Sequence, residues 1–165
     1  RRELALFNLA IDSKLRACDL LSLRVQDISH GQTIAARATV LQRKTGRPVC
    51  FEVTSLTRDA VAAWSADNAG ADNTYLFPSR IRHAAHLSTR QYSRIVRRWV
   101  SEVGLDSSAY GTHSLRRTKA ALIYRRTKNL RAVQLLLGHT KLESTVRYLG
   151  IEVDDALELA EQTEA

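Results

Sequence analysis

The chain has 165 residues, of which 44% are hydrophobic, so it is long enough for one globular domain with its own core. No apolar run approaches the roughly 18 residues of a membrane span, and the charged first residues are not a signal peptide. The absence of Met indicates that the chain is part of something longer. Cys18 and Cys50 lack metal-ligand spacing, which favours a reduced cytosolic compartment.

The charge is basic and unevenly distributed. The net charge is +8 and the pI is about 10.0. All 25 Lys and Arg lie in residues 1–150 with 11 acids, a net of +14, whereas residues 151–165 hold six acids and no base. Twenty of the bases are Arg, whose planar fork binds two phosphate oxygens at once. This pattern favours a polyanionic partner, although a genome rich in G and C would also raise the Arg content.

The first segment of the chain has helical spacing. Apolar residues predict a helix over residues 3–15, and the pattern resumes over residues 19–28. A short break is expected from Lys14 to Cys18, and it contains Arg16.

A β-hairpin is predicted next. Residues 33–42 and 48–53 have β-strand character, and Gly46 supplies a turn between them. Lys44 is therefore expected at or near the hairpin turn, and its neighbours Arg43 and Arg47 are candidate DNA contacts.

Two further helices and a long connection follow. Residues 57–67 predict an amphipathic helix with Val61 and Trp64 facing inward, and residues 70–86 predict an irregular connection. Ser88 or Thr89 can cap a helix that runs to about Val103. Its apolar stripe is expected to comprise Tyr92, Ile95, Val96, Trp99 and Val103, and its opposite face carries Arg90, Arg94, Arg97 and Arg98. That face is either solvated or lies along DNA, with Arg90 and Arg94 the candidate contacts.

A helix beginning near Ser114 is expected to form an anion site. His113 and Arg116 are three residues apart, so they point the same way at its first turn. Free backbone N–H groups and the positive end of the helix dipole lie at the same place. Arg117 is a further candidate DNA contact.

The last helical corner combines a stop and a start. Asn129 is expected to cap a helix that ends at Gly138, a residue type that tolerates positive φ. Thr140 and Glu143 have the spacing of a capping box for the next helix. His139 would then lie in the corner, and Tyr148 lies two turns along the new helix.

Five motifs together resemble the tyrosine recombinase, or phage integrase, family. They are LRACDLLSL around Arg16, RKTG around Lys44, HSLRRTKA with His113 and Arg116, LLGHT with His139, and TVRY ending at Tyr148. The H-x-x-R box, followed by LLGH and a Tyr nine residues after that His, is the most specific combination. The resemblance spans about residues 3 to 150 and implies a mainly α fold with a small antiparallel sheet (α+β) that carries Lys44.

The sequence departs from the family pattern at two places. Lys14 stands where a Gly commonly precedes Leu15 and Arg16, and Leu149-Gly150 replaces the Tyr-x-His ending of many members. Neither departure removes an expected catalytic group.

The chemistry of phosphodiester cleavage gives expected roles to four of the six candidate residues. Arg16 and Arg116 would neutralise the non-bridging oxygens and stabilise the pentacoordinate transition state. A phenol with a pKa near 10 is a poor nucleophile at pH 7, but nearby guanidinium groups favour the phenolate and a His can accept its proton. Tyr148 would attack phosphorus, with His113 as the general base.

The two remaining residues complete the expected reaction. Lys44 would protonate the leaving 5′ oxygen, and His139 would donate a hydrogen bond to a non-bridging oxygen. The resemblance implies a 3′-phosphotyrosine product, formed without ATP or metal. We expect no cofactor and no metal site, since His83 and His86 have H-x-x-H spacing without further ligands.

Other interpretations remain open at this point. Arg16 could pair with Asp19 at a helix start, Lys44 could be an ordinary hairpin charge, and Tyr148 could belong to the core. A type IB topoisomerase would use the same phosphotyrosine chemistry, and a DNA-binding regulator could keep the fold without catalysis.

The acidic segment 151–165 is expected to form a helix with one apolar side. Its charges are all negative, so it should dock on protein and not on DNA. The resemblance implies docking on a neighbouring subunit in a ring of four protomers on paired double-stranded DNA sites, and the alternative is docking back on its own domain. The expected location is the bacterial cytoplasm, in association with the nucleoid.

Overall fold

The computed structural model describes residues 1–31, 33–68, 74–81, 83–151, 157, 160 and 161. Its helices are α1 (Arg2–Ser13), α2 (Ala17–Leu21), α3 (Val25–Ile28), α4 (Ser55–Asp67), α5 (Thr89–Glu102), α6 (Thr112–Thr127), α7 (Leu130–Leu137) and α8 (Leu142–Leu149). Its strands are β1 (Ser29–His30), β2 (Thr33–Ile34), β3 (Arg37–Leu41) and β4 (Pro48–Glu52). The predicted class, mainly α with a small antiparallel sheet, is confirmed.

The predicted break after the first helix is confirmed and is shorter than expected. Helix α1 ends at Ser13 because Lys14 adopts the left-handed conformation, with φ of 54°. The chain turns at once and α2 begins after Arg16, which is its N-cap residue. The apolar pattern over residues 19–28 is divided between the short helices α2 and α3 and does not form one continuous helix.

The predicted hairpin is formed by β3 and β4. These strands pair antiparallel from Arg37 opposite Glu52 to Leu41 opposite Pro48. The loop between them is closed by hydrogen bonds from the Gln42 and Gly46 backbone N–H groups to the Arg47 and Gln42 carbonyls, at 2.9 and 2.8 Å. The start of the predicted first strand instead belongs to β2, which pairs with β1 in a separate two-stranded sheet.

The main hydrophobic core lies between α1, α4, α5 and the hairpin. Its largest fully buried apolar side chains include Leu6, Leu9, Phe51, Phe77 and Tyr92. Burial of each such side chain stabilises the fold by about 1.5–3 kcal/mol.

The inward-facing residues predicted on α4 lie in or against this core, whereas the last residue predicted on the apolar stripe of α5 does not. Val61 is fully buried, as predicted, and Trp64 is partly buried, with its indole N–H donating to the Leu76 carbonyl at 2.8 Å. Val103 is 70% exposed, so its assignment to the apolar stripe of α5 is wrong. The helix ends at Glu102, and Val103 is the capping residue beyond the buried part of that stripe.

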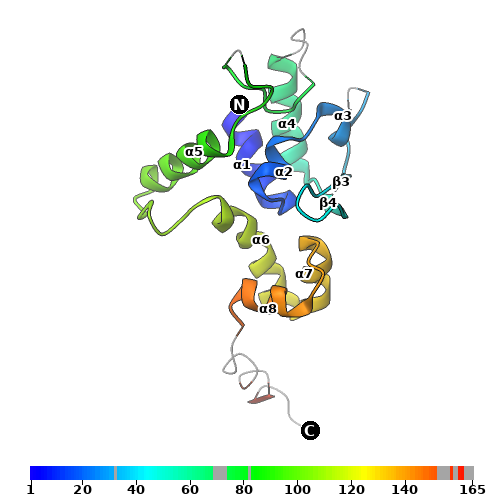
Figure 1. The fold of residues 1–165 in the computed structure, drawn as a ribbon, viewed down its shortest axis with the longest axis vertical. Helices are drawn as coiled ribbons and strands as arrows, with labels where there is room; N and C mark the ends of the chain where they lie inside the picture. The colour runs from blue at the N-terminus through cyan, green and yellow to red at the C-terminus, as the bar shows by residue number, and fades with distance from the viewer. Residues whose placement is uncertain (32, 69–73, 82, 152–156, 158–159, 162–165) are drawn as a thin grey trace.

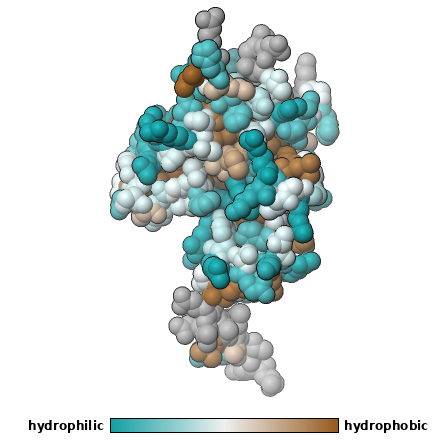
Figure 2. Space-filling model, in the orientation of Figure 1, coloured by the Kyte–Doolittle hydropathy of each residue, from teal (hydrophilic) through white to brown (hydrophobic). Residues whose placement is uncertain are grey.

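Helices α6, α7 and α8 form a second packed group with a small core of Ala120, Val133 and Leu137. Helix α6 leads from the N-terminal body to this group (Figure 1). The face seen in Figure 2 is mostly hydrophilic, with hydrophobic residues scattered over it. The two groups meet where α6 packs against α1 and where α7 packs against β4. None of the helices in the described part of the chain is long and apolar enough to cross a membrane.

The ends of α6, α7 and α8 test three sequence predictions. The Asn129 side chain accepts a hydrogen bond from the Ala132 N–H at 2.9 Å, so the predicted cap of α7 is confirmed. Helix α6 begins at Thr112, two residues earlier than expected. The predicted Thr140–Glu143 capping box is wrong, because α8 starts one residue later, with Lys141 as its N-cap and no side-chain cap.

Gly138 ends α7 with φ of 65° and lies directly against the hairpin. A Cβ atom added there would collide with Val49 Cγ2 and would press on the Gln42 amide. A left-handed residue with a Cβ also costs about 1–2 kcal/mol. Two independent reasons therefore require glycine at this position.

We predict that Gly138→Ala lowers the free energy of unfolding by about 2–5 kcal/mol, because the conformational cost is added to an overpacking cost of about 1–3 kcal/mol. Gly104→Ala is the matched control: Gly104 has φ of 76° but no atom within 4 Å of an added Cβ, so it pays the conformational cost alone. Urea denaturation of the two variants measures the difference. Equal losses would contradict the steric argument.

Candidate active site

The carbonyl oxygen of Leu137 connects three segments of the chain. It accepts hydrogen bonds from Gln42 Nε2 at 3.1 Å and from Arg116 Nη2 at 3.0 Å. The other end of the Gln42 amide, Oε1, accepts from Arg16 Nη1 at 2.8 Å. The guanidinium groups of Arg16, at the start of α2, and Arg116, on α6, are thereby held on either side of one amide and one carbonyl.

Arg116 is the buried member of this pair. Arg116 is only 3% exposed, and its Nε has no hydrogen-bond partner among the described residues. Burial lowers the pKa of Arg116, and the charge of Arg16 lowers it further, whereas Tyr148 raises it. Two like charges have thus been brought together without a carboxylate bound directly to either guanidinium in the described part of the chain.

Tyr148 packs between Arg116 and His139. The Arg116 Cζ lies 5.7 Å from the centre of the Tyr148 ring, and the ring centres of His139 and Tyr148 are 5.4 Å apart in an edge-to-face arrangement. The Tyr148 hydroxyl is buried and has no hydrogen-bond partner among the described residues. A buried hydroxyl normally finds such a partner, so this one is an exception at the centre of the site.

The pKa of Tyr148 is raised, since burial outweighs the opposing effect of Arg116, Arg117 and Arg16. Each guanidinium favours the phenolate, as predicted, but the predicted net preference for phenolate does not hold in the free protein. Burial in a low-dielectric environment disfavours the charged form more than these cations favour it. Tyr148 is therefore a neutral phenol at pH 7.

His139 makes a second contact with α8, through Thr145. Its Nδ1 lies 3.2 Å from the Oγ1 of Thr145, a fully buried residue. Burial, followed by the charges of Arg116 and Arg16, lowers the pKa of His139 to about 4. The imidazole is therefore neutral at pH 7.

A pocket of about 490 Å³ opens beside Tyr148, and it is lined by His113, Ser114, Arg117, Ser144, Arg147 and Tyr148. It lies at the first turn of α6, where helix N–H groups favour an anion. His113 is exposed there, while Arg116, one turn on, is buried. Both residues therefore approach Tyr148, but only His113 faces the open pocket.

The remaining predicted residues lie outside this cluster. Lys44 is exposed in the hairpin turn, between Arg43, which is also exposed, and the half-buried Thr45. The hairpin reaches the cluster through Gln42, which accepts the bond from Arg16. Arg47 is exposed on the same loop, and Arg90 and Arg94 are exposed on α5.

Two arginines among the candidates have structural partners. Arg117 lines the pocket, and its Nη2 donates to the Leu149 carbonyl at 2.8 Å. Arg98 is exposed on the same side of α5 as Arg90 and Arg94, and it forms an ion pair with Glu3.

Gln42 was not among the predicted site residues, and Asp19 was predicted only as a possible partner of Arg16. Asp19 is buried, and its Oδ1 accepts the Arg43 backbone N–H at 2.9 Å, while its Oδ2 has no partner in the described residues. The alternative in which Arg16 pairs with Asp19 is wrong, because Arg16 bonds to Gln42. The position of Asp19 one turn after Arg16 was an available signal, whereas nothing local distinguishes Gln42.

The family model and the related sequences that match this chain point to the same family. Residues 1–153 match the model of the phage integrase family. A probable integrase/recombinase of Bacillus subtilis, YoeC, is 31% identical over 93% of this chain and 80% of its own length. The tyrosine recombinase XerC of Erythrobacter litoralis is 29% identical over 92% of this chain but only 47% of its own length, so the chain spans about half of that relative.

Solved structures share the fold. The crystal structure of XerA recombinase superposes with a TM-score of 0.78 at 21% identity and covers 98% of this chain and 57% of that one. XerH recombinase bound to its difH substrate superposes with a TM-score of 0.74 at 21% identity, covering 98% and 46%. The arrangement of motifs, the family match and the shared fold agree, and the chain therefore belongs to the phage integrase family and forms a tyrosine recombinase catalytic domain.

Proposed function

We propose that this domain cleaves and rejoins DNA at specific sites through a covalent 3′-phosphotyrosine on Tyr148. The observation that carries the proposal is the buried hydroxyl of Tyr148 between Arg116 and His139, which has no hydrogen-bond partner in the part of the chain that the structure describes. A structural core tyrosine would bond its hydroxyl to a neighbour. A nucleophile must keep its oxygen free for the reacting phosphorus.

Arg16 and Arg116 bind the non-bridging oxygens of the scissile phosphate in this proposal. Their guanidinium groups are linked through Gln42 and Leu137, so their relative position exists before DNA binds. Preorganised charge of this kind stabilises the extra negative charge of the pentacoordinate transition state. His139 adds a hydrogen bond from Nε2 when Nδ1 accepts the Thr145 hydroxyl hydrogen.

The protons of the reaction balance with two further side chains. The Tyr148 oxygen forms a bond to phosphorus as its proton passes to His113, which lines the same pocket. A base is needed because burial keeps the phenol neutral. The bond from phosphorus to the 5′ oxygen breaks, and that oxygen takes a proton from Lys44, which the hairpin carries into the DNA. Rejoining reverses these transfers.

The wider assembly is also part of the proposal. Arg43, Arg47, Arg90, Arg94 and Arg117 contact the backbone of double-stranded DNA, and four protomers act on two paired sites in the bacterial cytoplasm, at the nucleoid. Related structures include XerH recombinase with its difH substrate and a lambda integrase dimer bound to a core site. The predicted helix over 151–165 falls largely outside the described residues, and we propose that it docks on a neighbouring protomer.

Tyr148→Phe should abolish the covalent DNA adduct and leave DNA affinity unchanged, because only the nucleophilic oxygen is lost. A denaturing gel with labelled DNA detects the adduct, and a gel shift measures affinity. Tyr110→Phe and Tyr124→Phe serve as controls that retain the adduct. An adduct that persists without the Tyr148 oxygen would place the nucleophile elsewhere.

Lys44→Ala should slow cleavage by about 10²–10⁴-fold on ordinary DNA, the usual contribution of a general acid. The rate should recover on DNA with sulfur at the bridging 5′ position, because a thiolate leaves without a proton. Arg116→Ala should not recover, since its charge acts on the non-bridging oxygens. Equal rescue of both variants, or of neither, is incompatible with the role of Lys44.

His139 should titrate with a pKa of about 4 in the free protein, as measured by NMR of its ring protons. Because this pKa is depressed, the unfolded chain binds a proton that folded His139 rejects, so stability falls as the pH drops from 6.5 towards 4. Binding of uncleaved DNA to the Tyr148→Phe variant should raise the pKa, because the phosphate offsets Arg16 and Arg116. A free-protein value near 6.5 would refute this account.

A further inference from the structure

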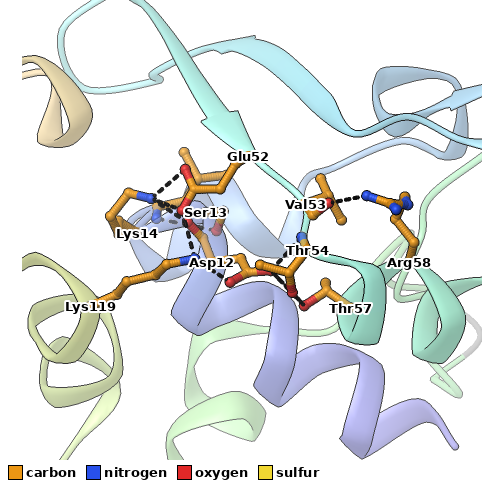
Figure 3. Close-up of polar contacts among 10 residues, drawn as sticks. Asp12, Ser13, Lys14, Glu52, Val53, Thr54, Thr57, Arg58 and Lys119 are labelled. Atoms are coloured by element: carbon orange, nitrogen blue, oxygen red, sulfur yellow. Dashed lines mark hydrogen bonds and ion pairs between the residues drawn. The ribbon is translucent and has the colours of Figure 1, made fainter. Parts of the chain in front are cut away.

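Four charged side chains form a network between α1, β4 and α6 (Figure 3). The Lys14 ammonium donates to both carboxylate oxygens of Glu52, at 2.9 and 3.0 Å, and to the Asp12 carbonyl. The Lys119 ammonium lies 2.6 Å from Asp12 Oδ1 and 2.7 Å from Glu52 Oε1. We call Asp12, Lys14, Glu52 and Lys119 the lysine network. It joins the end of α1, the end of β4 and the middle of α6.

The lysine network is saturated with hydrogen bonds. Asp12 Oδ2 accepts the Thr54 N–H and hydroxyl, at 2.9 and 2.7 Å, and the Thr57 hydroxyl at 2.6 Å. Burial would raise the pKa of both carboxyl groups, but Lys119 and the threonine bonds lower the pKa of Asp12, and Lys119 and Lys14 lower the pKa of Glu52. Two carboxylates therefore stay charged opposite two ammonium groups, which is the condition under which buried charge is tolerated.

Lys14 occupies a position that favours glycine. Its φ of 54° is in the left-handed region, where a side chain with a Cβ is strained. The same conformation occurs at Lys128, at the end of α6, but that side chain is exposed. The Lys14 side chain is completely buried and paired with Glu52. The strain at Lys14 is thus accompanied by a partly buried ion pair, whereas Lys128 has no ion pair with any of the described residues.

The lysine network adjoins both arginines of the proposed phosphate clamp. Lys14 precedes Arg16 by two residues, in the turn between α1 and α2. Lys119 follows Arg116 by three residues, about one turn along α6. Because both lysines bind the Glu52 carboxylate, the turn that carries Arg16 is tied to the helix that carries Arg116.

We propose that Lys14 and Lys119 are positioning residues for strand cleavage: through Glu52 and Asp12 they hold Arg16 and Arg116 at the separation that lets both bind one phosphate. This inference rests on the proposed function and adds a role for residues that do not touch DNA. The Gln42 and Leu137 bonds orient the guanidinium groups, and the lysine network fixes the backbones that carry them.

The test compares Lys14→Met with Lys128→Met, which removes an exposed lysine of the same backbone conformation. Single-turnover formation of the Tyr148 adduct is measured at saturating DNA on a nicked substrate that traps it. Lys14→Met should cleave about 10–100-fold more slowly, the effect of a small misplacement of catalytic groups. Its DNA affinity should stay at the wild-type value. Lys128→Met should match the wild type in both.

A substrate with a methylphosphonate at the scissile position separates positioning from general destabilisation. Replacing one non-bridging oxygen by methyl removes the negative charge, so the reaction needs one guanidinium fewer. If Lys14 acts by placing Arg16, most of the defect of Lys14→Met disappears on this substrate, as it should for Arg16→Ala. A fold that is merely weakened loses the same factor on both substrates.

Three further variants complete the test. Lys119→Met should reproduce the slow cleavage and its relief, which keeps the test independent of whether Lys14→Met folds. Lys128→Gly should raise the melting temperature by relieving strain, whereas Lys14→Gly should lower it by removing the ion pair. Folded Lys14 and Lys119 variants that cleave at the wild-type rate, or are slowed equally on both substrates, would overturn the positioning role. A wild-type protein that forms no adduct would instead refute the proposed function.

Discussion

The Leu137 carbonyl is the contact on which the arrangement of the site depends. Carbonyls in the last turn of a helix lack partners within the helix and carry partial negative charge, so they attract cationic donors. This one accepts both the Arg116 guanidinium and the Gln42 amide, and Gln42 in turn binds Arg16. The close approach is possible because Gly138 has no Cβ to meet the hairpin. One helix end therefore fixes the hairpin, α6 and the start of α2 together.

Positive charge is concentrated at this site around two neutral groups. Burial raises the pKa of the Tyr148 phenol and lowers that of the His139 imidazole, so both are uncharged at pH 7. Arg16 and Arg116 are linked through neutral oxygens and not through carboxylates. Two guanidinium groups in such a setting favour the binding of an anion, and a phosphodiester has the appropriate charge.

In the lysine network, an unfavourable backbone conformation at Lys14 is offset by an ion pair and hydrogen bonds. A lysine in the left-handed region contradicts the local preference for glycine, and its side chain is fully buried. The cost is offset by Glu52 and by the hydroxyl groups that saturate Asp12. Positions where local preference fails are often places where the tertiary structure imposes a specific requirement. Here the position is Lys14, two residues before Arg16.

Much of this protein was determined by short-range patterns in the sequence. Periodicity located most helices and the hairpin, and the H-x-x-R and LLGH motifs with the final Tyr indicated the family. The errors have local causes. Thr140 and Glu143 had the spacing of a cap, but α8 begins at Leu142, with Lys141 and not Thr140 as its N-cap residue.

Only the tertiary structure decided which side chains meet. Gln42 and Leu137 are 95 residues apart, and Lys119 and Asp12 are 107 residues apart, so no local spacing relates them. It also decided that Tyr148 is a neutral phenol, since burial exceeded the effect of the nearby arginines. The spacing of apolar residues in helices and strands can be recognised from consecutive residues, because backbone geometry repeats over a few positions. Burial and long-range hydrogen bonds depend on how the finished elements pack, and packing exists only once the chain has folded.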